Sequence, residues 1–285
     1  MAAWLEKVTT RALLVWVLVT ALGPLEAAGF AAQGGSGSSA SRQDALKAIP
    51  LDKLSEVNRQ KVLSVVQDTS FFRRLPICII RCDPELYLFV VRHPDVIVAI
   101  WQAMGITEIQ LEEISPGKFR YRDSEGTRGV VEYIYSTHDT ELIYAETVYE
   151  GPLLNRTVHS RAVILLKSGY TLETDGHYYI TCRLDAFVSV DKAAWEVLTK
   201  TLHPLVGRIA DTNFAQTAQF VAMLHETAAQ KPDGMQRLAA RLKGVQPPVR
   251  EEFARLLAQV AERSSSTRQG PRETVAERPG PQVRK

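Results

Sequence analysis

Glutamate and histidine are the side chains of this sequence that could move a proton near neutral pH. Glu132 and Glu146 each stand in an alternating segment typical of a strand. If either carboxyl group faced an apolar cavity, its pKa would be raised and it could act as a general acid or base. Strand glutamates are more often solvated. The sequence by itself leaves the direction of both side chains open.

The histidines do not converge on a catalytic set. They occupy expected turns, a loop edge, a helix kink and the late part of a helix: His138, His159, His177, His203 and His225. The sequence contains no nucleophile elbow, zinc-protease helix or phosphate-binding glycine loop. We therefore predict no catalytic residues and favour a non-enzymatic protein. A cyclase- or hydrolase-like enzyme, using a buried glutamate or histidine, is an alternative.

The three cysteines, Cys78, Cys82 and Cys182, cannot all pair within one chain. Cys78 and Cys82 would be neighbours in a helical turn but too far apart along one straight strand. A bridge from either one to Cys182 is equally compatible with the sequence. No cysteine or histidine pair stands at zinc-finger spacing, so we predict no metal site. Nothing in the sequence indicates an organic cofactor.

The first residues are typical of a secretory signal peptide, which we assign to residues 1–29. Lys7 and Arg11 precede an apolar run of about 11 residues, whereas a helix that spans a membrane needs about 20. Small residues at 27–29 suit cleavage. We expect an exported protein, periplasmic or secreted, with no transmembrane span in the mature chain.

The rest of the chain reads as one domain with polar ends. A Gly/Ser-rich stretch predicts a flexible linker over residues 30–43, and a Ser-, Arg- and Pro-rich stretch predicts a disordered tail over 264–285. The hydrophobic content of 45% between them suits a globular domain over 44–263. A net charge of +2, with dispersed basic residues, argues against a nucleic-acid partner.

Six alternating segments separated by turn residues form the centre of the domain. The expected strands are residues 107–114, 118–122, 129–137, 141–149, 161–174 and 177–190. Short turns between consecutive strands imply an antiparallel meander. In the last strand, Ile180, Cys182 and Leu184 share the face that we expect to be covered, whereas Arg183 and Asp185 share the other.

Segments with helical periodicity precede and follow these strands in the sequence. The periodicity predicts a helix over 51–67, a second over 96–104 that ends at Gly105, and a long one that begins after Asp191. The long helix has an expected kink at His203-Pro204. Two appended helices are expected within 233–263, and a short apolar run at 86–91 reads as a further strand.

The run Phe89-Val90-Val91-Arg92-His93-Pro94-Asp95-Val96-Ile97 looks like a first strand turning into a first helix. With the meander and the long helix, it resembles the START-like (SRPBCC) helix-grip fold over a core of 86–230. The resemblance implies an α+β fold whose antiparallel meander sheet wraps a long C-terminal helix. In that family the sheet and helix enclose a cavity for a lipid or other apolar ligand, and some members are polyketide cyclases or aromatases. The export signal and the extra helices at both ends depart from the family pattern.

Together with the predicted signal peptide, this resemblance leads us to expect an exported, non-enzymatic domain that binds an apolar or amphipathic small molecule. We expect Trp101, Tyr133, Tyr178 and Trp195 to border the ligand. A scaffold protein that docks a protein partner through the appended helices is the other alternative. It would require apolar residues of the last helix, such as Leu256 and Leu257, to stay exposed.

Overall fold

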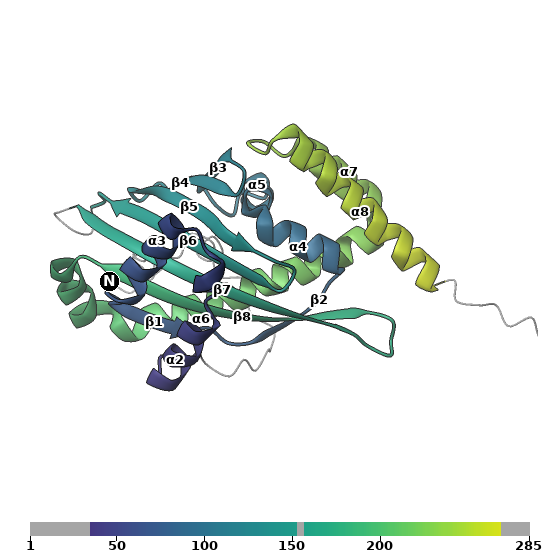
Figure 1. Cartoon of the computed structure of the whole chain (residues 1–285). Coiled ribbons are helices and arrows are strands. Elements are labelled where there is room, and N and C mark those ends of the chain that lie inside the picture. Colours follow the sequence, from purple (N-terminus) through teal and green to yellow (C-terminus); the bar gives the residue numbers. More distant parts are fainter. Residues whose placement is uncertain (1–34, 153–156, 269–285) are drawn as a thin grey trace, which may run out of the picture.

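The structure is a computed structural model that describes residues 35–152 and 157–268, without the side chains of 192–206 and 266–268. The predicted signal peptide, most of the predicted tail and the first residues of the predicted linker lie outside these ranges. The described chain is α+β, with one open antiparallel sheet and helices on both of its faces (Figure 1).

All six strands predicted for the meander are confirmed, with boundaries shifted by a few residues. They are β3 (Gln110–Ser115), β4 (Lys118–Arg122), β5 (Thr127–Ser136), β6 (Thr140–Tyr149), β7 (Val158–Leu172) and β8 (Tyr178–Val190). Each pairs with the next in antiparallel register, and the order across the sheet is β1-β8-β7-β6-β5-β4-β3. Alternation and turn chemistry were therefore sufficient to predict this part of the fold.

Two further strands, β1 (Phe71–Arg74) and β2 (Cys78–Arg81), were not predicted. Both pair with β8, so the last strand of the meander is flanked by a segment from near the start of the domain. Pro76 lies between them and has no N–H to donate to a ladder, which explains why this edge of the sheet is interrupted. Four-residue strands are too short to give a clear alternating pattern.

The strand expected at 86–91 is wrong, because this run lies within helix α4 (Pro84–Arg92). The Asp83 carboxylate accepts hydrogen bonds from the amides of Glu85 and Leu86, and Pro84 occupies the first turn. This N-terminal cap outweighs the β-rich composition. The segment 89–97 is therefore a helix–helix corner at His93, between α4 and the correctly predicted helix α5 (Pro94–Ala103), after which Gly105 adopts φ 71°.

The remaining helices lie at the two ends of the domain. Before the sheet come α2 (Ser39–Ala48), a 3₁₀ turn (Leu51–Lys53) and α3 (Glu56–Val66); after it come α6 (Lys192–Gln230), α7 (Pro232–Arg241) and α8 (Pro247–Arg268). Helix α6 runs unbroken through His203-Pro204. Residues 39–43 of the predicted linker and 264–268 of the predicted tail are helical. The linker therefore ends earlier, and the tail begins later, than the sequence predicted.

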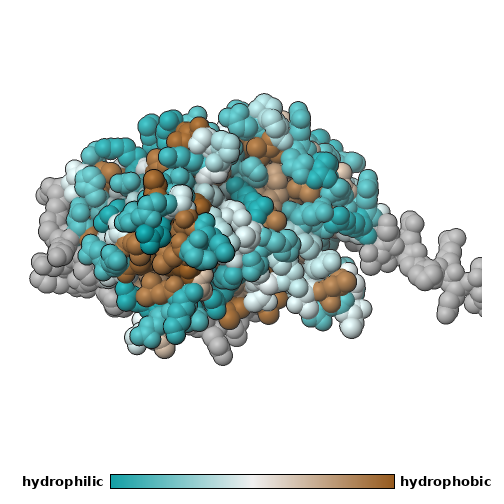
Figure 2. Space-filling view, in the orientation of Figure 1, coloured by the Kyte–Doolittle hydropathy of each residue, from teal (hydrophilic) through white to brown (hydrophobic). Residues whose placement is uncertain are grey.

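Each face of the sheet carries its own hydrophobic core. Helices α4, α5 and α6 lie on the inner face, with α7 and α8 packed against these helices, and α2 and α3 cover the outer face (Figure 1). Figure 2 views the outer side, where apolar side chains gather around α2 and α3. The face of β8 that we expected to be open is therefore covered at its second half, and Asp185 and Phe187 are both fully buried. Phe187 contacts Phe72 of β1, with ring centroids 4.9 Å apart.

Candidate ligand cavity

An apolar cavity of about 130 Å³ lies between the inner face of the sheet and helices α4, α5 and α6. Strand residues such as Ile164 and Leu184 form one wall, and helix residues such as Ile97 form the other. Alternate residues of each strand point to the same face, so the pattern that builds the core also aims these side chains at the helices. Ala145 and Ala218, which also line the cavity, contribute little volume to fill it.

Two of the four residues expected to border a ligand line this cavity. Trp101 of α5 is buried, and its ring meets Phe220 of α6 at a centroid distance of 5.5 Å. Tyr133 of β5 also lines the cavity. Tyr178 does not: it is 40% exposed at the start of β8 and belongs to a separate polar recess. The side chain of Trp195 lies outside the described residues.

The hydroxyl groups along the cavity wall bond to the protein, whereas the buried N–H of Trp101 has no hydrogen-bond partner among the described residues. Tyr133 donates its hydroxyl hydrogen to the Val91 carbonyl oxygen. The Tyr87 hydroxyl lies 2.7 Å from Ser168 Oγ and 3.1 Å from Cys182 Sγ. Burial raises the pKa of Cys182 to about 12, so its thiol is protonated at neutral pH. The wall therefore offers apolar contact and no thiolate nucleophile.

The glutamates that an enzyme would need do not line the cavity. Glu132 lies on the opposite face, where it accepts a 2.7 Å hydrogen bond from Lys61 of α3. Glu146 is exposed. Glu141, which the sequence did not single out, is buried and accepts a 2.8 Å hydrogen bond from Arg92 Nε. Each acid is thus solvated or neutralised by a base, and the enzyme alternative loses its glutamate candidates.

Asp95 is a buried acid that sequence reasoning placed only as a helix-start residue. Neither of its carboxylate oxygens has a hydrogen-bond partner of good geometry among the described residues, and His93 Nδ1 lies 3.9 Å away. Burial, followed by the charge of Glu113, raises the pKa of Asp95 to about 6, against the opposing effect of amides in the first turn of α5. Asp95 lies beside a second surface depression rather than the apolar cavity.

A polar recess of about 510 Å³ opens at the hairpin end of β8. It is lined by charged and imidazole side chains from β2, α4, α6, α8 and the turns that join β5 to β6 and β7 to β8. Among them are Arg81, Asp83, His177, His225 and Arg263. Arg263 Nη1 binds the Asp83 carboxylate at 2.5 Å, which joins the end of α8 to the cap of α4. Three histidines that are far apart in the sequence, His138, His177 and His225, therefore line one recess.

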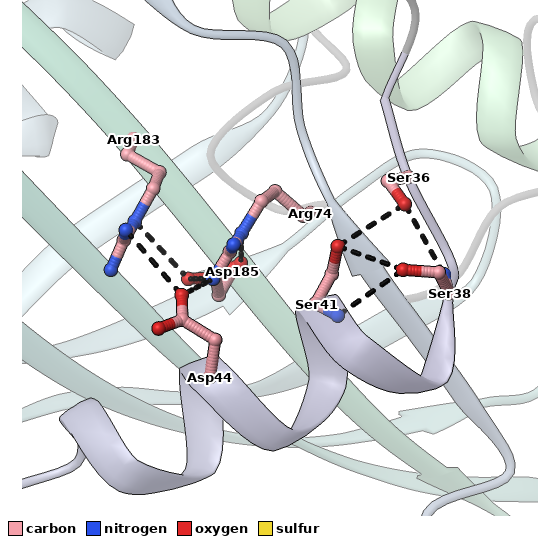
Figure 3. Close-up of polar contacts among 7 residues, drawn as sticks. All are labelled: Ser36, Ser38, Ser41, Asp44, Arg74, Arg183 and Asp185. Atoms are coloured by element: carbon pink, nitrogen blue, oxygen red, sulfur yellow. Dashed lines mark hydrogen bonds and ion pairs between the residues drawn. The ribbon is translucent and has the colours of Figure 1, made fainter.

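A charged cluster around the fully buried Asp185 is structural. Asp185 on the outer face is fully buried and receives two hydrogen bonds from Arg74, at 2.6 and 3.0 Å. Asp44 of α2 binds Arg74 at 2.7 Å and lies 3.6 Å from Arg183 (Figure 3). Ser36 pairs through its backbone with Arg74. This cluster fastens α2 and the preceding residues to the sheet and leaves no room for a ligand.

The described part of the chain shows neither a metal centre nor a membrane span. Among its residues, no three His, Cys, Asp or Glu side chains converge as metal ligands. No helix within the same residues is both long enough and apolar enough to cross a bilayer.

The appended helices do not present the surface that the scaffold alternative requires. Leu256, Leu257 and Val260 of α8 are buried. Helix α8 packs against α4 and α6, and Phe253 stacks on Phe89 with centroids 5.7 Å apart. The exposure that would have supported the scaffold alternative is therefore not found.

Comparisons with known proteins give only weak similarities. No protein-family model matches the sequence, and no curated protein matches it. A hypothetical protein of Helicobacter pylori is similar at 11% identity and TM-score 0.34, over 54% of this chain and 86% of its own. An uncharacterised protein of Rhizobium leguminosarum has 16% identity and TM-score 0.30, over 52% and 95%. Apo dicamba monooxygenase has 11% identity and TM-score 0.26, over 71% and 60%. With all three TM-scores below 0.5, these similarities carry no argument about function.

Proposed function

We propose that this protein is exported and holds a small apolar or amphipathic molecule in the cavity between the sheet and helices α4, α5 and α6. The observation that carries the proposal is the apolar space between the inner face of the sheet and three helices. Protein interiors are close-packed, so an unfilled apolar cavity costs stability, and an apolar ligand that fills it supplies the missing contacts.

A helix-grip arrangement of the sheet and α6 is part of this proposal. The order of the sheet, with β1 beside β8 at one end of the meander, supports it. So does the packing of α6 against the inner face, where Phe214, Ala218 and Val221 line the cavity. In this arrangement the first strand is the interrupted pair β1 and β2, rather than residues 86–91.

The size of the cavity limits the ligand. Pockets for drug-sized molecules usually enclose about 300–1,000 Å³, whereas this cavity encloses about 130 Å³. An apolar protein cavity of about 150 Å³ is large enough to bind benzene. We therefore expect the buried part of the ligand to be about the size of one aromatic ring or a short alkyl chain.

Native mass spectrometry of the protein purified from its exported compartment tests the proposal. We expect a discrete extra mass that disappears on denaturation. Ala218→Leu, which places three more carbon atoms in the cavity, should abolish the extra mass. Ala222→Leu, one turn further along α6 and outside the cavity lining, is the matched control and should retain it.

Two results would overturn the proposal. One is a wild-type protein that carries no extra mass and gains none when incubated with benzene or octan-1-ol. The other is an extra mass retained equally by both leucine variants, since it would then be bound elsewhere. Thermal unfolding of each variant establishes that it is folded.

A further inference from the structure

The polar recess continues the apolar cavity along the same elements. Val221 lines the cavity, and His225, four residues later on α6, lines the recess. On β2, Ile80 lines the cavity, and Cys82, two residues later and also buried, lines the recess. Four residues of helix are about one turn, or roughly 5–6 Å. The two spaces therefore lie within reach of a single molecule of modest length.

Arg81 is the group in this recess that is most available to a ligand. It is exposed, and among the described residues it forms no ion pair. Its Nη2 lies 2.6 Å from His177 Nε2. Because a guanidinium only donates, Nε2 must be the acceptor, which places the proton of a neutral His177 on Nδ1. The remaining donors of Arg81 are free to bind an anion.

The acids of the recess are already engaged by a different arginine. Asp83 and Glu85 of α4 both bind Arg263 of α8, at 2.5 and 3.4 Å. His225 is half-buried, and burial lowers its pKa, so it stays neutral near pH 7 and keeps one N–H donor. The recess therefore combines an available cation with a neutral imidazole donor.

We propose that the ligand is an amphiphile with an anionic head, such as a carboxylate, that binds Arg81 and His225 in the recess while its apolar part fills the cavity. This inference rests on the proposed function, because it assigns a head group to the same ligand. A guanidinium recognises a carboxylate through two parallel hydrogen bonds, which an alcohol cannot form.

Paired probes of one chain length test the head group separately from the cavity. Binding of octanoate and of octan-1-ol is measured by calorimetry at pH 7.5 with the full mature chain. We expect octanoate to bind about 10-fold or more tightly than octan-1-ol, as a charge-assisted hydrogen bond allows. Arg81→Gln should remove this preference and leave octan-1-ol binding unchanged. Arg237→Gln is the control, since exposed Arg237 on α7 lines neither space.

The possible outcomes separate the two proposals. If neither probe binds, the cavity proposal fails and this inference fails with it. If both probes bind with equal affinity, or if Arg81→Gln weakens both equally, the cavity proposal stands and the anionic head is wrong. Retention of the octanoate preference in Arg81→Gln would also overturn the inference.

Discussion

The two faces of the sheet are packed in different ways. On the outer face, α2 and α3 cover the strands, and the buried charge of Asp185 is matched by Arg74. On the inner face, α4, α5 and α6 leave an apolar cavity beside hydroxyl groups that bond only to the protein. The outer face thus uses its polar groups to fix an element in place, whereas the inner face keeps unused apolar space. Under the proposed function, the outer layer supports the fold and the inner layer binds the ligand.

The largest predicted effect tests the outer face. Asp185→Ala leaves the partly buried guanidinium of Arg74 with Asp44 as its remaining carboxylate partner. Breaking a buried ion pair costs about 3–5 kcal/mol, so we expect a loss of that order in the free energy of unfolding. Urea denaturation followed by circular dichroism measures it.

Asp44→Ala is the matched control for this change. Asp44 is more than half exposed, and exposed ion pairs contribute less than about 1 kcal/mol. If both variants lost the same free energy of unfolding, the burial of Asp185 would add nothing to the stability of the outer face.

The next effect concerns the edge of the inner face. Cys78 and Cys182 are direct cross-strand partners in β2 and β8. Such partners have Cα separations of about 4.5–5.5 Å, within the range of disulfides. We expect oxidised glutathione to take two electrons and two protons from these thiols and form this bridge, which stabilises the fold by about 2–4 kcal/mol. The reaction needs alkaline pH, because burial raises the pKa of Cys78 to about 11.

Peptide mapping without reductant identifies the bridge. Cys82→Ser should leave it intact, and Cys78→Ser should remove it. A bridge between Cys82 and Cys182 would contradict the register of β2 on β8.

A third effect concerns the pH dependence of stability. Burial raises the pKa of Asp95 from 3.8 to about 6, a difference that corresponds to about 3 kcal/mol. The folded state binds this proton more tightly than the unfolded state. Asp95 therefore destabilises the fold above about pH 6, and this penalty disappears below about pH 4.

Asp95→Asn should stabilise the protein by up to about 3 kcal/mol at pH 8 and change little at pH 3.5. Denaturation curves of the variant and the wild type at both pH values give the difference in their free energies of unfolding. The contributions of other acids are the same in both proteins and cancel in this difference. A constant difference at both pH values would show that the carboxyl group does not titrate as its burial indicates.

The smallest effect tests how the N-terminal helix is held. The Ser38 hydroxyl accepts a hydrogen bond from the Ser41 amide at the start of α2 (Figure 3). Ser38→Ala should cost about 1 kcal/mol in the free energy of unfolding. Ser265→Ala, in the last turns of α8, is the comparison, since this exposed hydroxyl bonds to the Glu262 carbonyl oxygen and does not cap a helix start. No loss in Ser38→Ala would mean that α2 contributes little to the outer layer.

The sequence predicted elements better than it predicted their environment. The meander was correct because alternation and turn residues are local signals. The strand at 86–91 was wrong because its apolar content hid the helix cap at Asp83-Pro84. Burial of Asp185 was missed, since it depends on α2, a distant helix in a stretch that reads as a linker.

The candidate site shows the same limit. Trp101 and Tyr133 line the cavity, but Tyr178, on the correct face of its strand, does not. The pairing of β6 with β7 ends at Lys167, so the rest of the β7–β8 hairpin extends beyond the meander, with only β2 beside it (Figure 1). Tyr178 therefore has no core beneath it. Arg81 and His225 could not be brought together from sequence, because β2 was not recognised.

The central claim is that the inner cavity accepts an apolar molecule, and xenon tests it most directly. Crystals of the mature protein are pressurised with xenon, and its position is located by anomalous scattering. We predict a xenon atom between Trp101, Ala145 and Ala218, because dry apolar cavities of this size bind xenon. Ordered water in that space, or a tightly packed core with no xenon, would contradict the account.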